Sequence, residues 1–254
     1  MASGIFDVSR TRVAPVFELL QRRSDDWVRT LLVMCGGPTA TPVDPTLNLE
    51  FQKGFWGKAE HALDPPVGLL SWLIRNPNPQ SLAEDAQMER RLLARGDPTL
   101  VGRALHGLRT SAAPKGWHLL ESPTVPDVFI ETPDALIVIE GKRAEQGPNL
   151  DPTWLTGRPP IWRHIDAAWE IRGRRQVFGL YLVQGQESDG ALSPHWADAF
   201  REAVSGPVLE KSFPHRSTAE RDAIAACMIG GTTWNLVCKT FDIPMASSLL
   251  ASSA

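Results

Sequence analysis

The segment PDVFIETPDALIVIEGK, residues 126–142, is the most informative part of the chain. It holds two runs rich in β-forming residues, with a turn-forming Pro133-Asp134 pair between them. We therefore predict a β-hairpin in which this pair makes up the two-residue loop. Counting away from the loop along both runs places Asp127 directly opposite Glu140.

Residues that lie opposite each other in an antiparallel pair point to the same face of the sheet. Lys142 shares that face with Glu140, because residues i and i+2 of a strand point the same way. The hairpin thus gathers two carboxylates and an ammonium group at one end. A type I turn is not the favoured two-residue connection, so a longer loop with a shifted register is the alternative. A shift of one residue would turn Asp127 to the other face.

This group of charges points to metal-assisted chemistry. Two neighbouring carboxylates resist ionisation unless a cation lies between them, and their oxygens suit Mg²⁺ or Mn²⁺. Such an ion lowers the pKa of a bound water and stabilises a leaving oxygen, while Lys142 would orient the water or neutralise developing charge. Asp127, Glu140 and Lys142 are therefore our candidate catalytic residues for phosphodiester hydrolysis. The alternative is a set of solvated charges that protects an edge hairpin.

The same residues carry a family resemblance. Pro126-Asp127, twelve intervening residues, Glu140 and then Gly141-Lys142 resemble the active-site signature of the PD-(D/E)XK, or restriction-endonuclease-like, nuclease superfamily. The resemblance implies Mg²⁺-dependent (or Mn²⁺-dependent) cleavage of DNA. It also implies that Asp127 and Glu140 are metal ligands, that the carbonyl of Gly141 is a further ligand, and that Lys142 is the catalytic lysine.

The remaining sequence alternates helical periods with short apolar runs. We expect helices at 13–21, 27–35, 59–63, 64–75, 81–95, 97–108, 161–171, 195–204, 217–228 and 232–241, and strands at 117–120, 128–131, 135–139 and 177–183. This order predicts an α/β fold, a mixed central sheet flanked by helices with extra N- and C-terminal helices. Over residues 81–183 it resembles the αβββαβ core of the same superfamily.

From this order we derive three parts. Residues 1–80 form an N-terminal helical region packed on the core, residues 81–212 form the nuclease-like core, and residues 213–254 form a C-terminal helical extension.

The resemblance also implies further polar residues from the helices before and after the sheet. The candidates are Glu60, Glu84 and Glu89 on one side and Arg163 and His164 on the other. We favour Glu60 as a catalytic residue, because it follows the stretch GFWGK, residues 54–58, whose glycines would let the backbone approach a ligand closely. An aromatic plug on a tight turn explains that stretch equally well.

Charge taken over the whole chain argues mildly against a nucleic-acid partner, because 26 basic and 29 acidic residues give a net charge of −3. Locally the balance differs, since residues 89–115 hold six basic and two acidic residues and residues 172–175 hold three arginines. Either cluster would follow a phosphate backbone, although solvated helix faces are an equal alternative.

Three widely spaced cysteines without a C-x-x-C pair exclude a disulfide framework or a zinc ribbon. Together with the absence of a long apolar run, they predict a cytoplasmic protein with no membrane partner. DNA is the expected partner, and a homodimer or a partner protein also fits.

The second hypothesis is a non-catalytic nucleic-acid-binding or assembly module that keeps the nuclease fold. The helices expected between Ser217 and Phe241, with Gly230-Gly231 between them, would then form a weak helix-turn-helix.

Overall fold

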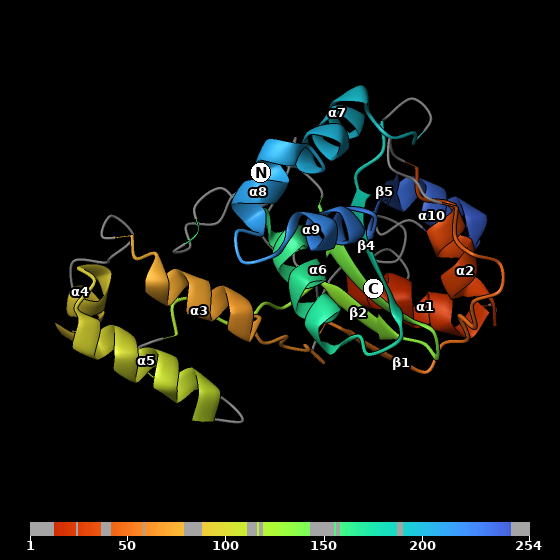
Figure 1. The fold of residues 1–254 in the computed structure, drawn as a ribbon. Helices are drawn as coiled ribbons and strands as arrows, with labels where there is room; N and C mark the ends of the chain where they lie inside the picture. Colours follow the sequence, from red (N-terminus) through yellow and green to blue (C-terminus); the bar gives the residue numbers. More distant parts are fainter. Residues whose placement is uncertain are drawn as a thin grey trace, which may run out of the picture.

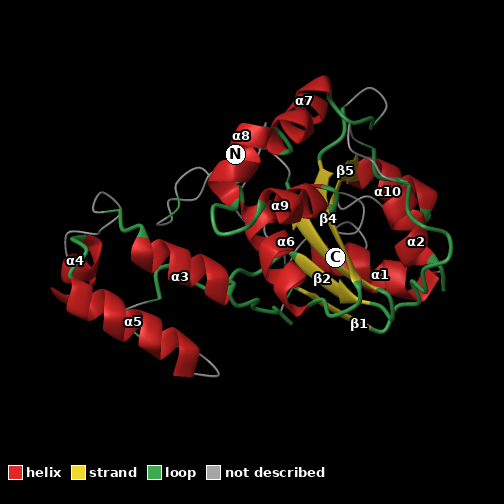
Figure 2. Cartoon of the chain, in the orientation of Figure 1, coloured by secondary structure: helices red, strands yellow, loops and turns green. Residues whose placement is uncertain are grey.

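Figure 1 and Figure 2 show the computed structural model, which describes residues 13–23, 25–36, 42–57, 59–78, 88–110, 116, 119–142, 155, 158–186 and 190–244. Within these residues one five-stranded sheet has the order β1-β2-β3-β4-β5. The strands are β1 (Lys53–Trp56), β2 (Val128–Glu131), β3 (Ala135–Gly141), β4 (Gln176–Val183) and β5 (Met228–Thr233). β1–β2 and β2–β3 are antiparallel pairs, whereas β3–β4 and β4–β5 are parallel.

The β2–β3 hairpin has the predicted register. Val128 pairs with Ile139 and Phe129 pairs with Val138, so the next position outward sets Asp127 opposite Glu140. The turn closes as a two-residue loop, because the Thr132 amide donates to the Ala135 carbonyl at 2.9 Å. The alternative with a longer loop and shifted register is therefore wrong.

Helices cover both faces of the sheet, which confirms the predicted α/β fold with a mixed, helix-flanked sheet (Figure 2). One face packs against α1 (Val13–Arg23), α2 (Trp27–Val33) and α10 (Trp234–Thr240). The other packs against α6 (Pro160–Ile171), α7 (Pro194–Ala203), α8 (Gly206–Ser212) and α9 (Thr218–Ala225). Because both faces are covered, β3 is apolar on both, with Ile137 and Ile139 facing one layer and Leu136 and Val138 the other.

A third group of helices lies to one side of the sheet (Figure 1). It comprises α3 (Val67–Arg75), α4 (Met88–Ala94) and α5 (Pro98–Thr110), which share a separate apolar core. We call residues 64–120 the helical arm. In the chain the arm is an insertion between the neighbouring strands β1 and β2.

The strand expected at 117–120, before the hairpin, is not where the sequence placed it. Residues 119–120 are not strand, and 117–118 lie outside the described residues. β1 takes that position instead, and the helix expected at 59–63 is absent. The rings of Phe55 and His61 lie 4.4 Å apart and continue onto Phe129, so this segment is held extended by stacking across the β1–β2 pair.

The helix expected from Asp64 begins later, at Val67. Pro65 and Pro66 each disfavour helical backbone in the residue before them, Asp64 and Pro65 respectively, so the helix cannot begin at Asp64. Pro66 is the N-cap residue, with ψ at 135°. The cap expected at Ser81 lies outside the described residues.

The helix-turn-helix expected near the C-terminus is wrong. α9 ends at Ala225, and the buried strand β5 separates it from α10. A Cβ on Gly231 would lie 2.6 Å from the Tyr181 carbonyl oxygen, so Gly231 allows close strand packing rather than a turn between helices. Gly230 has a φ of 91° where the β4–β5 register shifts.

The sheet crosses both expected boundaries, because β1 lies within residues 1–80 and β5 within residues 213–254. Among the described residues, no helix combines the length and apolar character needed to cross a membrane.

Candidate active site

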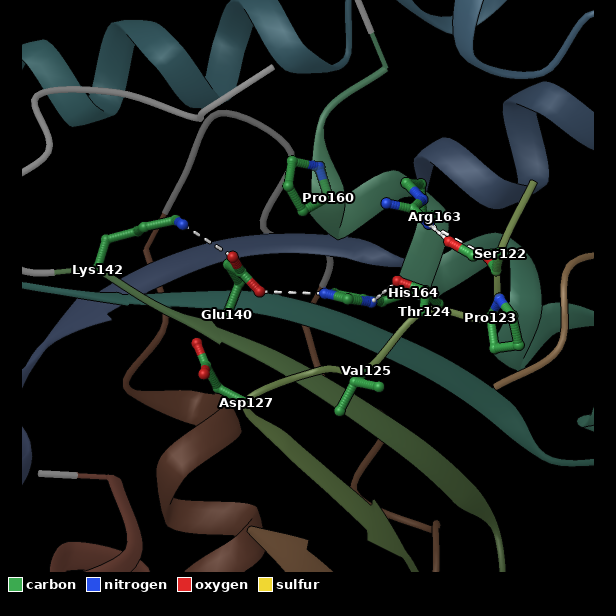
Figure 3. Close-up of a pocket in the computed structure, with 10 residues that line it drawn as sticks. All are labelled: Ser122, Pro123, Thr124, Val125, Asp127, Glu140, Lys142, Pro160, Arg163 and His164. Carbon is green, nitrogen blue, oxygen red and sulfur yellow. Dashed lines mark hydrogen bonds and ion pairs between the residues drawn. The ribbon is translucent and has the colours of Figure 1, made fainter. Parts of the chain in front are cut away.

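A polar pocket of about 290 Å³ opens at the end of the β2–β3 hairpin (Figure 3). Its lining comes from three places: residues 122–125 and 127 before β2, the end of β3 with Lys142, and the first turns of α6. Three of the predicted site residues, Asp127, Glu140 and Lys142, line it together. The hairpin register explains this, because opposite residues share a face and Lys142 follows Glu140 by two positions.

Each carboxylate is held by a different donor. Asp127 Oδ2 accepts a hydrogen bond from the Gly141 amide at 2.8 Å, across the hairpin end. Glu140 Oε1 lies 2.9 Å from Lys142 Nζ. Figure 3 shows the two carboxyl groups pointing into the same space.

His164 on α6 is the second group that holds Glu140. Its Nε2 lies 3.0 Å from Glu140 Oε2, and its Nδ1 lies 2.7 Å from Thr124 Oγ1. All three side chains are buried. The chain Thr124–His164–Glu140 therefore fixes the direction of the glutamate from the side opposite Lys142.

The two carboxylates differ in acidity. Burial raises the pKa of Asp127, and the charge of Glu140 raises it further. Burial would also raise the pKa of Glu140, but the hydrogen bond and charge of His164, together with Lys142, outweigh it and lower that pKa. Glu140 is thus the better compensated charge, and Asp127 is the one that a cation would relieve.

The donor chemistry fits a hard divalent cation. Asp127 and Glu140 offer carboxylate oxygens in the pocket, and the Gly141 carbonyl follows Glu140 directly in the chain. Across the described ranges, no three or more His, Cys, Asp or Glu side chains gather into a metal site. Mg²⁺ is usually held by one or two protein carboxylates with waters and substrate phosphate, so this sparse set suits it.

Nothing in the pocket supports the prediction that Glu60 is a catalytic residue. Glu60 is exposed and does not line it, and Glu89 is exposed on α4 of the helical arm. Glu84 lies outside the described residues. Of the two residues proposed from the later helix, both Arg163 and His164 line the pocket.

The GFWGK stretch forms most of β1, and its packing is that of an aromatic plug. The Trp56 ring lies 5.7 Å from Phe17 and 6.0 Å from Phe51. A Cβ on Gly54 would overlap the Trp56 ring, so this glycine makes room for a side chain rather than for a ligand.

A buried ionic network lies behind the pocket and holds α6. Arg158 donates to Glu121 at 2.7 Å and to Asp166 at 2.5 Å, and Arg163 donates to Glu121 at 3.2 Å. Arg216 reaches Asp166 from the other side at 2.9 Å. This network fixes the position of the helix that carries His164.

Sequence reasoning missed Thr124, which lines the pocket and holds His164. Its amide and carbonyl also pair with Leu63, at 2.9 and 2.8 Å. No periodic pattern marks residues 121–126, so only their proximity to Asp127 could have suggested a role.

In comparisons with known proteins, no family model, no curated protein and no solved structure matches the chain.

Proposed function

We propose that this protein is a divalent-metal-dependent nuclease that hydrolyses phosphodiester bonds in DNA, built on a PD-(D/E)XK core. The observation that carries the proposal is the meeting of Asp127, Glu140 and Lys142 in one pocket at the end of a hairpin. The mixed sheet also supports the proposal, because the antiparallel hairpin is followed by α6 and then by a strand parallel to β3.

Asp127, Glu140 and the Gly141 carbonyl would hold the metal. The bound ion would activate a water and stabilise the leaving oxygen. Lys142 keeps its ammonium beside Glu140, where it would offset negative charge that develops on the phosphate. His164 and Thr124 hold Glu140 in position, so the site needs little rearrangement when substrate arrives.

Cleavage of plasmid and oligonucleotide DNA tests the proposal, with Mg²⁺, Mn²⁺ or EDTA. We expect metal-dependent cleavage by the wild type and a loss of roughly a hundredfold or more in Lys142→Ala. Lys211→Ala, which removes an exposed lysine of α8, is the matched control and should keep full activity.

Two results would contradict the proposal. One is cleavage that persists in EDTA or in Lys142→Ala. The other is DNA binding without cleavage under any metal, which would favour the non-catalytic binding module.

A further inference from the structure

The outer face of the helical arm carries a row of exposed basic side chains. In α5, Leu100, Ala104 and Leu108 face the core of the arm. The opposite face carries Arg103, His106 and Arg109, all exposed. Residues three apart lie close together on a helix surface, so these side chains form one strip, which we call the α5 basic strip. The helix contains no acidic residue.

The arm differs in charge from the rest of the molecule. Residues 88–110, which span α4 and α5, hold five arginines and two acidic residues, a net charge of +3. Because the whole chain has a net charge of −3, all other residues together carry −6. Two further arginines, Arg91 on α4 and Arg95 directly after it, are exposed. A positive surface on an otherwise acidic chain selects a polyanion.

The arm is joined to the body beside the candidate site. Its two connections meet at the Leu63–Thr124 bridge, and Thr124 itself lines the pocket and holds His164. At its base α3 packs on the body, because a Cβ on Gly68 would lie 3.3 Å from the His215 ring. The base of the arm therefore lies beside the pocket. A polyanion bound along the arm would be held to the body near the candidate site.

We infer that the α5 basic strip binds the phosphate backbone of a DNA duplex outside the cleavage site and holds the duplex to the pocket. The inference rests on the proposed function, which supplies the substrate class. It assigns binding to the arm and chemistry to the hairpin, so that the two are separable by substitution. Phosphate contacts of this kind set position and affinity without reading sequence.

The test measures binding of a labelled DNA duplex to the full chain by fluorescence anisotropy. The measurement is made in EDTA, so that no cleavage occurs. The double variant Arg103→Ala/Arg109→Ala should bind roughly tenfold more weakly, and the slope of log K against log salt should fall by about two. Arg201→Ala, which removes an exposed arginine of α7, is the matched control and should bind as the wild type does. Circular dichroism confirms that each variant is folded.

The inference is overturned if the double variant keeps the affinity and salt slope of the wild type, or if the wild type binds no duplex. Displacement of the duplex by polyglutamate as effectively as by unlabelled duplex would also overturn it, in favour of an acidic protein partner. Failure of the proposed function would give a different result. Wild type and Lys142→Ala would both fail to cleave DNA, while the double variant would still bind the duplex more weakly than the wild type. Conversely, cleavage lost only in Lys142→Ala with unchanged binding in the double variant would sustain the nuclease and reject the strip.

Discussion

Asp127 and Glu140 face the same pocket, but different groups hold their charges. Burial and the neighbouring Glu140 raise the pKa of Asp127, so its ionised form is disfavoured in the folded protein. The stability that this group contributes is present below its unfolded pKa and is lost as pH rises through its folded pKa. Without a metal, the folded protein therefore carries an electrostatic cost at Asp127 near neutral pH.

Replacing Asp127 with asparagine should remove that cost. The amide oxygen still accepts the hydrogen bond from Gly141, while the repulsion from Glu140 disappears. In EDTA at pH 7, we expect Asp127→Asn to unfold at the wild-type temperature or above it. Mg²⁺ should stabilise the wild type, by about 2.7 kcal/mol at a hundred times its Kd, but not the variant.

Thermal unfolding with and without Mg²⁺ measures both effects. Asp198→Asn, which changes an exposed carboxylate of α7, should respond to Mg²⁺ as the wild type does. A variant that unfolds earlier than the wild type in EDTA, or that keeps the Mg²⁺ response, would contradict this account of Asp127.

Local sequence signals predicted the elements that depend on local contacts. The hairpin register follows from a two-residue loop, and the start of α9 follows from the reciprocal hydrogen bonds of Ser217 and Glu220. The edge strands β1 and β5 were missed because their partners lie far along the chain. Four residues with a glycine and two aromatic rings give no alternation from which a strand could be inferred.

The candidate site divides in the same way. Asp127, Glu140 and Lys142 belong to one hairpin, so the sequence alone could bring them together. The choice between Arg163 and His164 needed the three-dimensional phase of α6, since adjacent helix residues point about 100° apart. The structure places both at the pocket, where His164 contacts Glu140 and Arg163 donates to Glu121 and to the Ser122 carbonyl.

The contact between α6 and β4 depends on a residue without a side chain. A Cβ on Gly179 would overlap the side chain of Ile165, which is fully buried on α6. Gly179→Ala should therefore destabilise the protein by about 1–3 kcal/mol, because helix and strand would have to separate.

Gly102→Ala is the opposite case, since a Cβ there meets nothing within 4 Å on the outer face of α5. It should stabilise the protein by about 0.5–1 kcal/mol through helix propensity.

Urea unfolding of the two variants under the same conditions compares these effects directly. Equal shifts, or a stabilising Gly179→Ala, would show that α6 and β4 are not packed as closely as described.

Across the whole molecule, the buried network around Asp166 joins segments far apart in the chain. Arg158 precedes α6, whereas Arg216 and His215 lie before α9, and all three contact this one carboxylate. Burial would raise the pKa of Asp166, but the charge of Arg158, the contact with His215 and the charge of Arg216 outweigh it and lower that pKa. The stability that Asp166 contributes is therefore present above its unfolded pKa, near 3.8, and is lost as pH falls through its folded pKa.

Asp166→Asn should remove this contribution and leave the arginines without their counter-charge. We expect a loss of about 3–5 kcal/mol at pH 7 and a weaker dependence of stability on pH below about 4. Urea unfolding across that pH range measures both, with Asp198→Asn as the exposed control. An unchanged acid limb in Asp166→Asn would show that other carboxylates govern acid unfolding.

The insertion of the helical arm also imposes an order on folding. β1 and β2 are neighbours in the sheet, but residues 57–127 separate them in the chain, whereas two residues close the β2–β3 hairpin. Because closing a long loop costs more entropy, β1 should dock after the hairpin has formed. In stopped-flow experiments, substitutions in β1 should then speed unfolding while leaving the folding rate nearly unchanged. The outer strand becomes a late and readily released part of the sheet, while the hairpin that brings the two carboxylates together assembles first.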